Sequence, residues 1–325
     1  GNPLVIEKAQ VDAELIRLAT LQRRCNQLVE QHGASWTRSF GEVGVTASYV
    51  RGLPDELQVL GAHHVDRYGK PAIVDADFVR ALGASTVRSI HLSQPSAAEL
   101  SAIAANPPRE LRRLELFRPR ATSHELRVLL ASLPALEVFE LFCVDGFQLA
   151  IDVLAPLQRL VELQLYESGL DRKALDALGR MPAAARLRAL RIGCNRGLAA
   201  DAIAVLDGRF PALTEVALIQ CNLPDTALAT PGLQIPRELS LDGNETGAAG
   251  IEALCAQPRV ENLESLDVTS FRIHDAGLAA IARCPRLGNL RSLVVAHGGF
   301  SDAGIDALAA STSARLHTLR IPQTS

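Results

Sequence analysis

The chain has 325 residues, of which 48% are apolar and 21% are charged, and its net charge is −3 with histidine neutral. A chain without net positive charge lacks the electrostatic footprint that binding to phosphate backbones requires, so we expect no nucleic-acid partner. Because no apolar run approaches the roughly 20 residues that cross a bilayer, we also expect no membrane insertion.

The first 84 residues carry a different pattern from the rest of the chain. Apolar residues recur at helical spacing over residues 11–29, which predicts a helix. Alternating apolar residues predict a strand over residues 43–49, and residues 57–59 offer it an antiparallel partner across a turn at 51–55. We therefore expect residues 1–84 to form a unit of helices and a β-hairpin.

From residue 85 to residue 325, the six-residue pattern apolar-x-x-apolar-x-apolar recurs ten times at intervals of 23 to 27 residues. Its copies begin at Val87, Leu111, Leu136, Leu160, Leu187, Leu213, Pro236, Leu263, Leu290 and Leu316. A period in this range indicates a solenoid, in which each unit completes its apolar core only by stacking on its neighbours. The predicted domains are a cap over residues 1–84 and repeats over residues 85–325.

Each repeat is predicted to contain a strand followed by a helix. The last two apolar residues of the pattern are two apart, which is the spacing of a strand. Start signals for helices lie at Ser96 with Glu99, Thr122 with Glu125, Asp275 and Asp302. Strands stack about 4.8 Å apart and helices roughly 8–10 Å apart, so the array must curve with the strands inside. We expect an α/β horseshoe with a concave parallel sheet and convex helices.

The segment from Phe271 to Leu287 resembles the consensus of leucine-rich repeats, in particular the cysteine-containing and ribonuclease-inhibitor-like subclasses. The resemblance implies a helical outer layer and an Asn or Cys after each strand whose side chain hydrogen-bonds the turn. Asn195, Cys221 and Asn244 occupy this position. Irregular loops are expected where other residues occupy it, at Pro95, Pro119, Val144, Ser168, Phe271 and Gly298.

Residues 1–84 also resemble part of a known domain. The segments Glu14–Leu18, His32–Trp36 and Arg51–Pro54 are similar to the later half of a bacterial repeat-companion domain that often precedes leucine-rich repeats. The resemblance implies that residues 1–84 cover the apolar end of the first repeat. At the other end no capping helix follows Ile321, so we expect a partner or a further segment to contact that end.

Signatures of catalysis and of cofactor binding are missing from the sequence. The pair His63 and His64 has no neighbours that complete a metal-ligand set, so we expect neither an enzyme nor a cofactor or metal site. The six cysteines include no CxxC pair and are interpreted as reduced, mostly buried residues of a cytoplasmic protein. A disulfide between Cys194 and Cys221 on adjacent repeats remains an alternative.

A partner protein is expected on the concave face, where side chains between the buried positions of each strand face solvent. Three aromatic residues fall at the seventh pattern position of consecutive repeats, and charged or polar residues flank them. The predicted partner-binding residues are Phe117, Phe142, Tyr166, Glu115, Glu140, Glu162, Gln164 and Arg191. Aromatic side chains supply large contact area at low entropic cost, so the main hypothesis is a protein-interaction scaffold.

Two other functions stay open at the level of sequence. The first is regulation of an enzyme such as a small GTPase, with Arg118 or Arg120 offered to its active site. It rests on analogy with other proteins of similar fold. The second is a structural part of a larger assembly, joined through the carboxyl-terminal end. The alternative interpretation of the aromatic residues themselves is that they cover one another.

Overall fold

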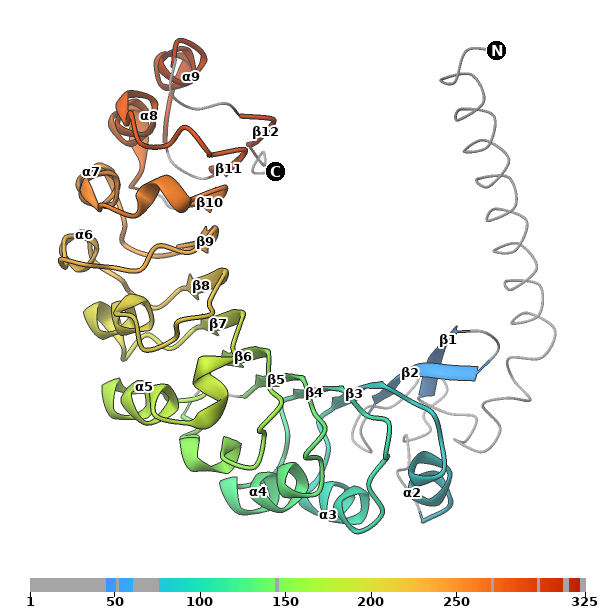
Figure 1. Ribbon diagram of the computed structural model, residues 1–325. Coiled ribbons are helices and arrows are strands. Elements are labelled where there is room, and N and C mark those ends of the chain that lie inside the picture. Colours follow the sequence, from blue (N-terminus) through green and yellow to red (C-terminus); the bar gives the residue numbers. More distant parts are fainter. Residues whose placement is uncertain are drawn as a thin grey trace, which may run out of the picture.

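The computed structural model describes residues 45–50, 53–60, 76–143, 146–269, 272–296, 299–311 and 316–321. Within these residues a single sheet of twelve strands runs through the chain in sequence order. Figure 1 shows the strands on the inner side of an arc and the helices on its outer side. The predicted α/β horseshoe is therefore confirmed.

The sheet begins with one antiparallel pair and continues with parallel strands. Strand β1 pairs antiparallel with β2, and each later strand pairs parallel with the one before it. The strands are β1 (Val45–Val50), β2 (Leu53–Leu60), β3 (Ser89–Ser93), β4 (Arg113–Phe117), β5 (Val138–Phe142), β6 (Glu162–Tyr166), β7 (Ala189–Gly193), β8 (Glu215–Ile219), β9 (Glu238–Ser240), β10 (Ser265–Asp267), β11 (Ser292–Val294) and β12 (Thr318–Arg320). Strands β3–β8 have five residues each, whereas β9–β12 have three.

Helical segments connect successive strands across the outer side of the arc. The α-helices are α2 (Ala76–Gly83), α3 (Ala97–Ala105), α4 (Ser123–Ala131), α5 (Arg172–Gly179), α6 (Asp225–Leu228), α7 (Ala248–Ala256), α8 (His274–Arg283) and α9 (Asp302–Ala309). Short 3₁₀ segments are η2 (Ile151–Leu154), η3 (Pro182–Ala185), η4 (Ala199–Leu206) and η5 (Val260–Asn262). In the repeats that contain η2 and η4, the outer layer is made by 3₁₀ turns rather than by an α-helix.

The fourth and sixth positions of the repeat pattern form the core between the sheet and the helices. In the second and fourth repeats, for example, Leu114, Leu116, Leu163 and Leu165 are at most 2% exposed. The same positions are in register from strand to strand, so their side chains make one continuous apolar layer. This is the stacked core that the sequence period predicts.

The predicted start signals open helices in the structure. Ser96 and Glu99 form a reciprocal capping box at α3, and Thr122 and Glu125 form one at α4. Asp302 is the first residue of α9, and Asp275 lies in the first turn of α8. Carboxylates at these positions accept the free N–H groups of the first turn or favourably face the positive end of the helix dipole.

The Asn and Cys side chains that follow the strands bond the turns together, as expected. Asn195 donates from Nδ2 to the carbonyl oxygens of Leu165 at 3.1 Å and Gly193 at 2.8 Å. Its Oδ1 accepts from the backbone N–H groups of Ser168 and Leu170, both at 3.1 Å. Asn244 makes the equivalent bonds two repeats later. In the repeat between them, the Cys221 thiol donates to the carbonyl oxygen of Ile219 at 3.4 Å.

The loops without such a residue are held by other hydrogen bonds. At Pro95 and Pro119 the two chain segments stay paired beyond the strands. Arg120 donates its N–H to the Pro95 carbonyl oxygen at 2.7 Å, and Ser96 and Arg120 form an isolated parallel β-bridge. Ser168 is fully buried and donates its hydroxyl to the Tyr166 carbonyl at 3.0 Å. Backbone pairing thus replaces the missing side-chain bond at Pro95 and Pro119, and a hydroxyl replaces it at Ser168. The irregularity of these loops stays a prediction. The predictions at Val144, Phe271 and Gly298 lie outside the described residues.

The predicted antiparallel strand pair is present, and its second strand begins earlier than expected. Strands β1 and β2 pair from Val45 with Val59 to Val50 with Leu53, so residues 53–55 belong to β2 and not to the turn predicted over 51–55. Strand β2 then pairs parallel with β3 and joins the hairpin to the repeats. The helix predicted over residues 11–29 and the pair His63 and His64 lie outside the described residues.

At the other end, strand β12 pairs with β11 and leaves apolar side chains in solvent. Leu319 is 39% exposed and Ile321 is 40% exposed, whereas their counterparts in the preceding strands are buried. In the preceding repeats, the equivalent residues are buried because the next repeat of the stack packs against them.

Asn195→Ala should lower the free energy of unfolding by at least about 2 kcal/mol, because it leaves two buried N–H groups and two carbonyls without their partner. Urea unfolding measures the loss. Asn289→Ala is the matched control, because that exposed side chain makes one bond, to the Glu261 carbonyl at 2.8 Å. A similar small loss in both variants would contradict a structural role for the buried amide.

Candidate functional site on the concave face

Three aromatic side chains form a row on the concave face of strands β4, β5 and β6. Phe117 pairs in register with Phe142, and Phe142 with Tyr166. The ring centroids of Phe117 and Phe142 are 6.2 Å apart and tilted by 45°, and those of Phe142 and Tyr166 are 4.7 Å apart and nearly parallel. All three side chains are half-buried. We call Phe117, Phe142 and Tyr166 the aromatic row.

The aromatic row ends on a glycine. The Tyr166 ring lies over Gly193, the next residue in register on β7, and a Cβ at that position would collide with the ring. Burial against this neighbour raises the pKa of the Tyr166 hydroxyl above its ordinary value. The rings thus cover one another and one glycine, yet each keeps part of its surface in solvent.

Arg118 extends the aromatic row at its other end, a contact that the sequence did not predict for this residue. Its guanidinium carbon lies 5.3 Å from the centre of the Phe117 ring, within the range of a cation–π contact. Its backbone is left-handed, with φ of 49°, and its N–H donates to the Phe142 carbonyl at 2.5 Å. Gln94, Glu167 and Cys194 adopt the same left-handed conformation at the equivalent position of their repeats. Aligning the repeats therefore places Arg118 directly after the strand that carries Phe117.

Ion pairs run beside the aromatic row. On its amino-terminal side, His91 lies 2.9 Å from Glu115. Arg113 pairs with Glu140 on the next strand, and Arg191 donates from Nε to Glu215 at 2.7 Å. Glu162 is half-buried at the start of β6. The structure therefore brings the predicted site residues together on four neighbouring strands, β4 to β7, and their charged partners extend the group to His91 on β3 and Glu215 on β8.

The expectation that all these side chains stand in open solvent is wrong for two of them. Glu140 is only 5% exposed and Gln164 only 9%. They are neighbours in register, and strands about 4.8 Å apart crowd their side chains between Glu115 and Arg191. Burial raises the pKa of Glu140, while the neighbouring Arg113 acts against that shift. Glu140 is better placed to orient Arg113 than to meet a partner directly.

Farther along the arc the concave face becomes polar. Ser240 donates its hydroxyl to Asp267 at 3.4 Å, and Asp267 accepts the backbone N–H of Thr269 at 3.0 Å. These side chains satisfy one another and include no apolar anchor. At the third, fifth and seventh positions of the repeats that the structure describes, aromatic side chains occur only on β4 to β6, in the amino-terminal half of the arc.

The concave face has an excess of negative charge. The third, fifth and seventh positions of the repeats from β3 to β12 carry seven carboxylates and three arginines, which gives −4 with histidine neutral. The carboxylates are Glu115, Glu140, Glu162, Glu215, Glu238, Asp242 and Asp267, and the arginines are Arg113, Arg191 and Arg320. The charge of the whole chain is only −3, so the negative charge is concentrated on this face.

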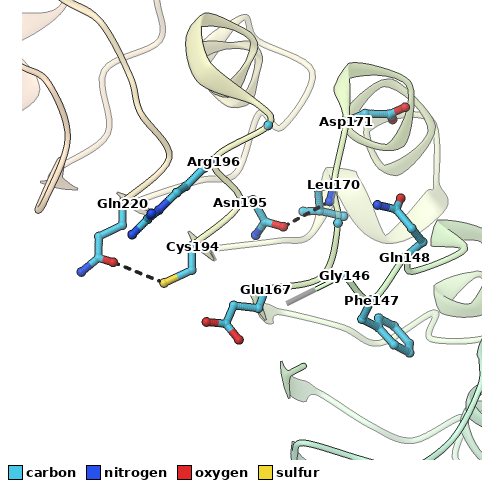
Figure 2. Close-up of a pocket in the computed structure, with 12 residues that line it drawn as sticks. Gly146, Phe147, Gln148, Glu167, Leu170, Asp171, Cys194, Asn195, Arg196 and Gln220 are labelled. Atoms are coloured by element: carbon cyan, nitrogen blue, oxygen red, sulfur yellow. Dashed lines mark hydrogen bonds between the residues drawn. The ribbon is translucent and has the colours of Figure 1, made fainter. Parts of the chain in front are cut away.

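A hollow of about 650 Å³ opens beside the end of the aromatic row. Figure 2 shows its walls, which come from the loops that follow strands β5 to β8. Its lining includes Glu167 and Cys194, which directly follow Tyr166 and Gly193 in the chain, so the hollow lies beside the ends of β6 and β7, where the row ends. Arg196 and Glu167 give the walls both charges. Asn195 and Leu170 also line the hollow, and the N–H of Leu170 donates to the Asn195 side chain.

The cysteines of the described residues are free. Cys143, Cys221 and Cys284 are buried and Cys194 and Cys255 are partly buried. The alternative disulfide between Cys194 and Cys221 is wrong, because the Cys194 thiol faces Gln220 Oε1 at 3.6 Å whereas Cys221 points into the turn. Burial raises the pKa of Cys221 to about 11 and that of Cys143 to about 12, so both thiols stay protonated at neutral pH.

Along the part of the chain that the structure describes, no helix is long and apolar enough to cross a membrane. Nor do three or more His, Cys, Asp or Glu side chains of these residues gather where they could hold a metal ion.

Comparisons with known proteins agree with the fold. Residues 261–282 match the family model of a leucine-rich repeat, and no curated protein sequence matches the chain. A Bacteroides fragilis protein of solved structure aligns with a TM-score of 0.50 and 12% identity over 82% of this chain and 74% of that one. At this identity the likeness concerns the fold alone.

Two other solved structures align with lower TM-scores. The complex of Rad7 and Elc1 from yeast aligns with a TM-score of 0.47 and 17% identity over 73% of this chain and 70% of that one. An internalin from Listeria monocytogenes aligns with a TM-score of 0.43 and 15% identity over 83% of this chain and 87% of that one.

Gly193→Ala should destabilise the protein by about 1–3 kcal/mol, because the added methyl group displaces the Tyr166 ring. Gly197→Ala is the matched control, since nothing lies within 4 Å of a Cβ there. Urea unfolding compares the two variants. In a Tyr166→Ala background the cost of Gly193→Ala should shrink, and an unchanged cost would show that the ring is not its cause.

Glu140 should give the stability a specific pH dependence. Its pKa is raised from 4.5, so the folded state holds the proton more tightly than the unfolded chain does. Its contribution is full below pH 4.5 and is lost as the pH rises through the raised pKa. The unfolding free energy of the wild type minus that of Glu140→Gln should therefore fall as the pH rises above 4.5.

Glu125→Gln is the control of opposite sign for that experiment. A hydrogen bond from Thr122 lowers the pKa of Glu125, so its contribution is present above pH 4.5 and is lost as the pH falls. Urea unfolding of the wild type and both variants across this range gives the two slopes. Slopes of the same sign would contradict the burial of Glu140.

Proposed function

We propose that this leucine-rich-repeat protein is an interaction scaffold that holds another protein on its concave face, at the aromatic row. The observation that carries the proposal is three half-exposed rings in contact and in register on an open sheet, in a chain with only 4% aromatic residues. Rings fixed by stacking lose little side-chain entropy when a partner covers them. The same stacking that partly buries the rings therefore also prepares them for binding.

The charge around the aromatic row favours a basic partner surface. The concave face carries −4, and Glu115 and Glu162, which precede the rings on β4 and β6, keep part of their surface in solvent. Complementary charge speeds encounter and disfavours acidic partners, while the rings supply affinity. A lysine or arginine side chain can place its aliphatic part on the rings and its charge beside a carboxylate.

The hollow beside Tyr166 gives the proposed partner a second point of contact. It lies beside the ends of β6 and β7, where the row ends, and has walls of both charges, so it suits a polar side chain or a turn of the partner. A concave hollow next to flat aromatic surface is the arrangement in which interface anchors are typically found.

Finer assignments belong to the same proposal. The hydrogen bonds of Asn195, Cys221 and Asn244 support the cysteine-containing or ribonuclease-inhibitor-like subclass. The pairing of β2 with β3 supports a capping role for the hairpin, as in the bacterial repeat-companion domain. The free thiols support a reducing compartment such as the bacterial cytoplasm.

Replacing the aromatic row should abolish capture of the partner. We expect the variant Phe117→Ala/Phe142→Ala/Tyr166→Ala to lose the proteins that the wild type retains from lysate, because truncating one interface anchor typically costs about 2 kcal/mol or more. Affinity capture with mass spectrometry identifies those proteins. Circular dichroism and urea unfolding check that the variant remains folded.

A control variant on the polar half of the same face makes the capture experiment specific. Ser240→Ala/Asp267→Ala/Thr269→Ala changes three concave residues without touching a ring. It should retain the partner, and capture should weaken as salt is raised because the complementary charges are screened. Unchanged capture by the folded aromatic-row variant would refute the proposed site.

A further inference from the structure

Arginines gather at the edge of the sheet where the parallel strands begin. Each strand from β3 to β11 pairs with the next in register, so the segments that precede the strands lie along the same edge of the arc. These segments are 85–88, 108–112, 134–137, 156–161, 182–188, 209–214, 232–237, 258–264 and 285–291. They contain eleven arginines and four carboxylates, a net charge of +7.

Most of these arginines have no counter-charge. Arg112 lies 3.7 Å from Glu137, Arg237 lies 3.6 Å from Glu264, Arg209 pairs with Asp176 and Asp207, and Arg291 bonds a backbone carbonyl. The other seven are exposed, and no carboxylate of the described residues pairs with them. This set, the basic edge, consists of Arg88, Arg109, Arg159, Arg186, Arg188, Arg259 and Arg286.

Compensation of helix dipoles does not account for the basic edge. The helices run back toward this edge, so their negative ends lie near it, and basic residues in their last turns would be stabilising. Only α2 and α8 have such a residue among the described helices, Arg80 and Arg283. Members of the basic edge lie instead on turns and at strand starts, outside the helices.

The structure separates charges that the composition averages. The chain as a whole carries −3 and its concave face −4, yet the segments that precede strands β3 to β11 carry +7. Opposite charges on separate surfaces allow two partners of opposite charge to bind at the same time. The expectation of no polyanionic partner rested on the net charge alone, and the net charge does not describe this edge.

We propose that the basic edge binds a flat anionic surface, namely the headgroup layer of a bilayer that contains acidic phospholipids. Figure 1 shows the strands along the inside of a broad arc. Cations along one edge of an arc can all meet a plane at once. Each basic residue held near an anionic leaflet adds to the attraction, and no apolar insertion is needed.

A bilayer fits the basic edge better than nucleic acid or a protein does. A straight duplex can follow only a part of an arc, and the only aromatic residue in the edge segments, Phe210, is 4% exposed and cannot stack on bases. Protein interfaces centre on anchors that fill pockets. The seven members of the basic edge are instead dispersed over six repeats between the first and the ninth, as suits a diffuse surface charge.

Co-sedimentation with lipid vesicles tests the proposal on the full chain. The wild type should pellet with vesicles of phosphatidylcholine containing roughly one-third phosphatidylglycerol, but not with phosphatidylcholine alone, and high salt should release it. Arg159→Gln/Arg186→Gln/Arg188→Gln should weaken vesicle binding on the order of a hundredfold. The fold of each variant is checked by circular dichroism and by its thermal unfolding midpoint.

The matched control removes three positive charges from the opposite edge of the arc. Arg120→Gln/Lys173→Gln/Arg196→Gln alters exposed residues that lie after the strands or at the start of α5, and it should bind vesicles as the wild type does. The proposal is overturned if the wild type does not require the acidic lipid, or if both triple variants weaken equally. Tighter binding of a DNA duplex than of the acidic vesicles would also overturn it.

Discussion

Every feature of this molecule depends on strands that pair in parallel without a shift in register from one repeat to the next. The pairing places each residue of a repeat beside its equivalent in the neighbouring repeats. Any property shared by equivalent residues is therefore extended into a continuous stripe. Leucines become a core, aromatic residues become a stack, and arginines become a charged edge. The amide of Asn195, which joins two turns, helps to fix that register.

Much of the fold could be predicted because its signals are local and repeated. The apolar pattern predicts both the strand and the side of it that is buried, and a capping box such as that of Ser96 and Glu99 needs only four residues to be recognised. Stacking distances then dictate curvature without any knowledge of the partner. The positions of Phe117, Phe142 and Tyr166 on one face follow from the same alternation.

The rest of the candidate site depends on distances between repeats, which a pattern does not contain. The burial of Glu140 arises from neighbours on β4 and β6, and the contact of Tyr166 with Gly193 joins residues 27 positions apart. Composition alone misleads about the edge, since charges that cancel in a sum are separated in space. At Pro95 and Pro119 backbone pairing replaces the expected side-chain bond, and the pattern does not reveal it.

The unequal strand lengths have a mechanical consequence. Between β3 and β8 each neighbouring pair shares five residues or nearly so, and stacked rings reinforce the join, whereas β9 to β12 share only three residues per pair. A curved array of repeats bends most where neighbouring strands share the fewest paired residues. We therefore expect the part of the arc from β3 to β8 to be rigid and to hold the aromatic row in place. The part from β9 to β12 should bend more easily, so that it can open or close around a partner bound at the row.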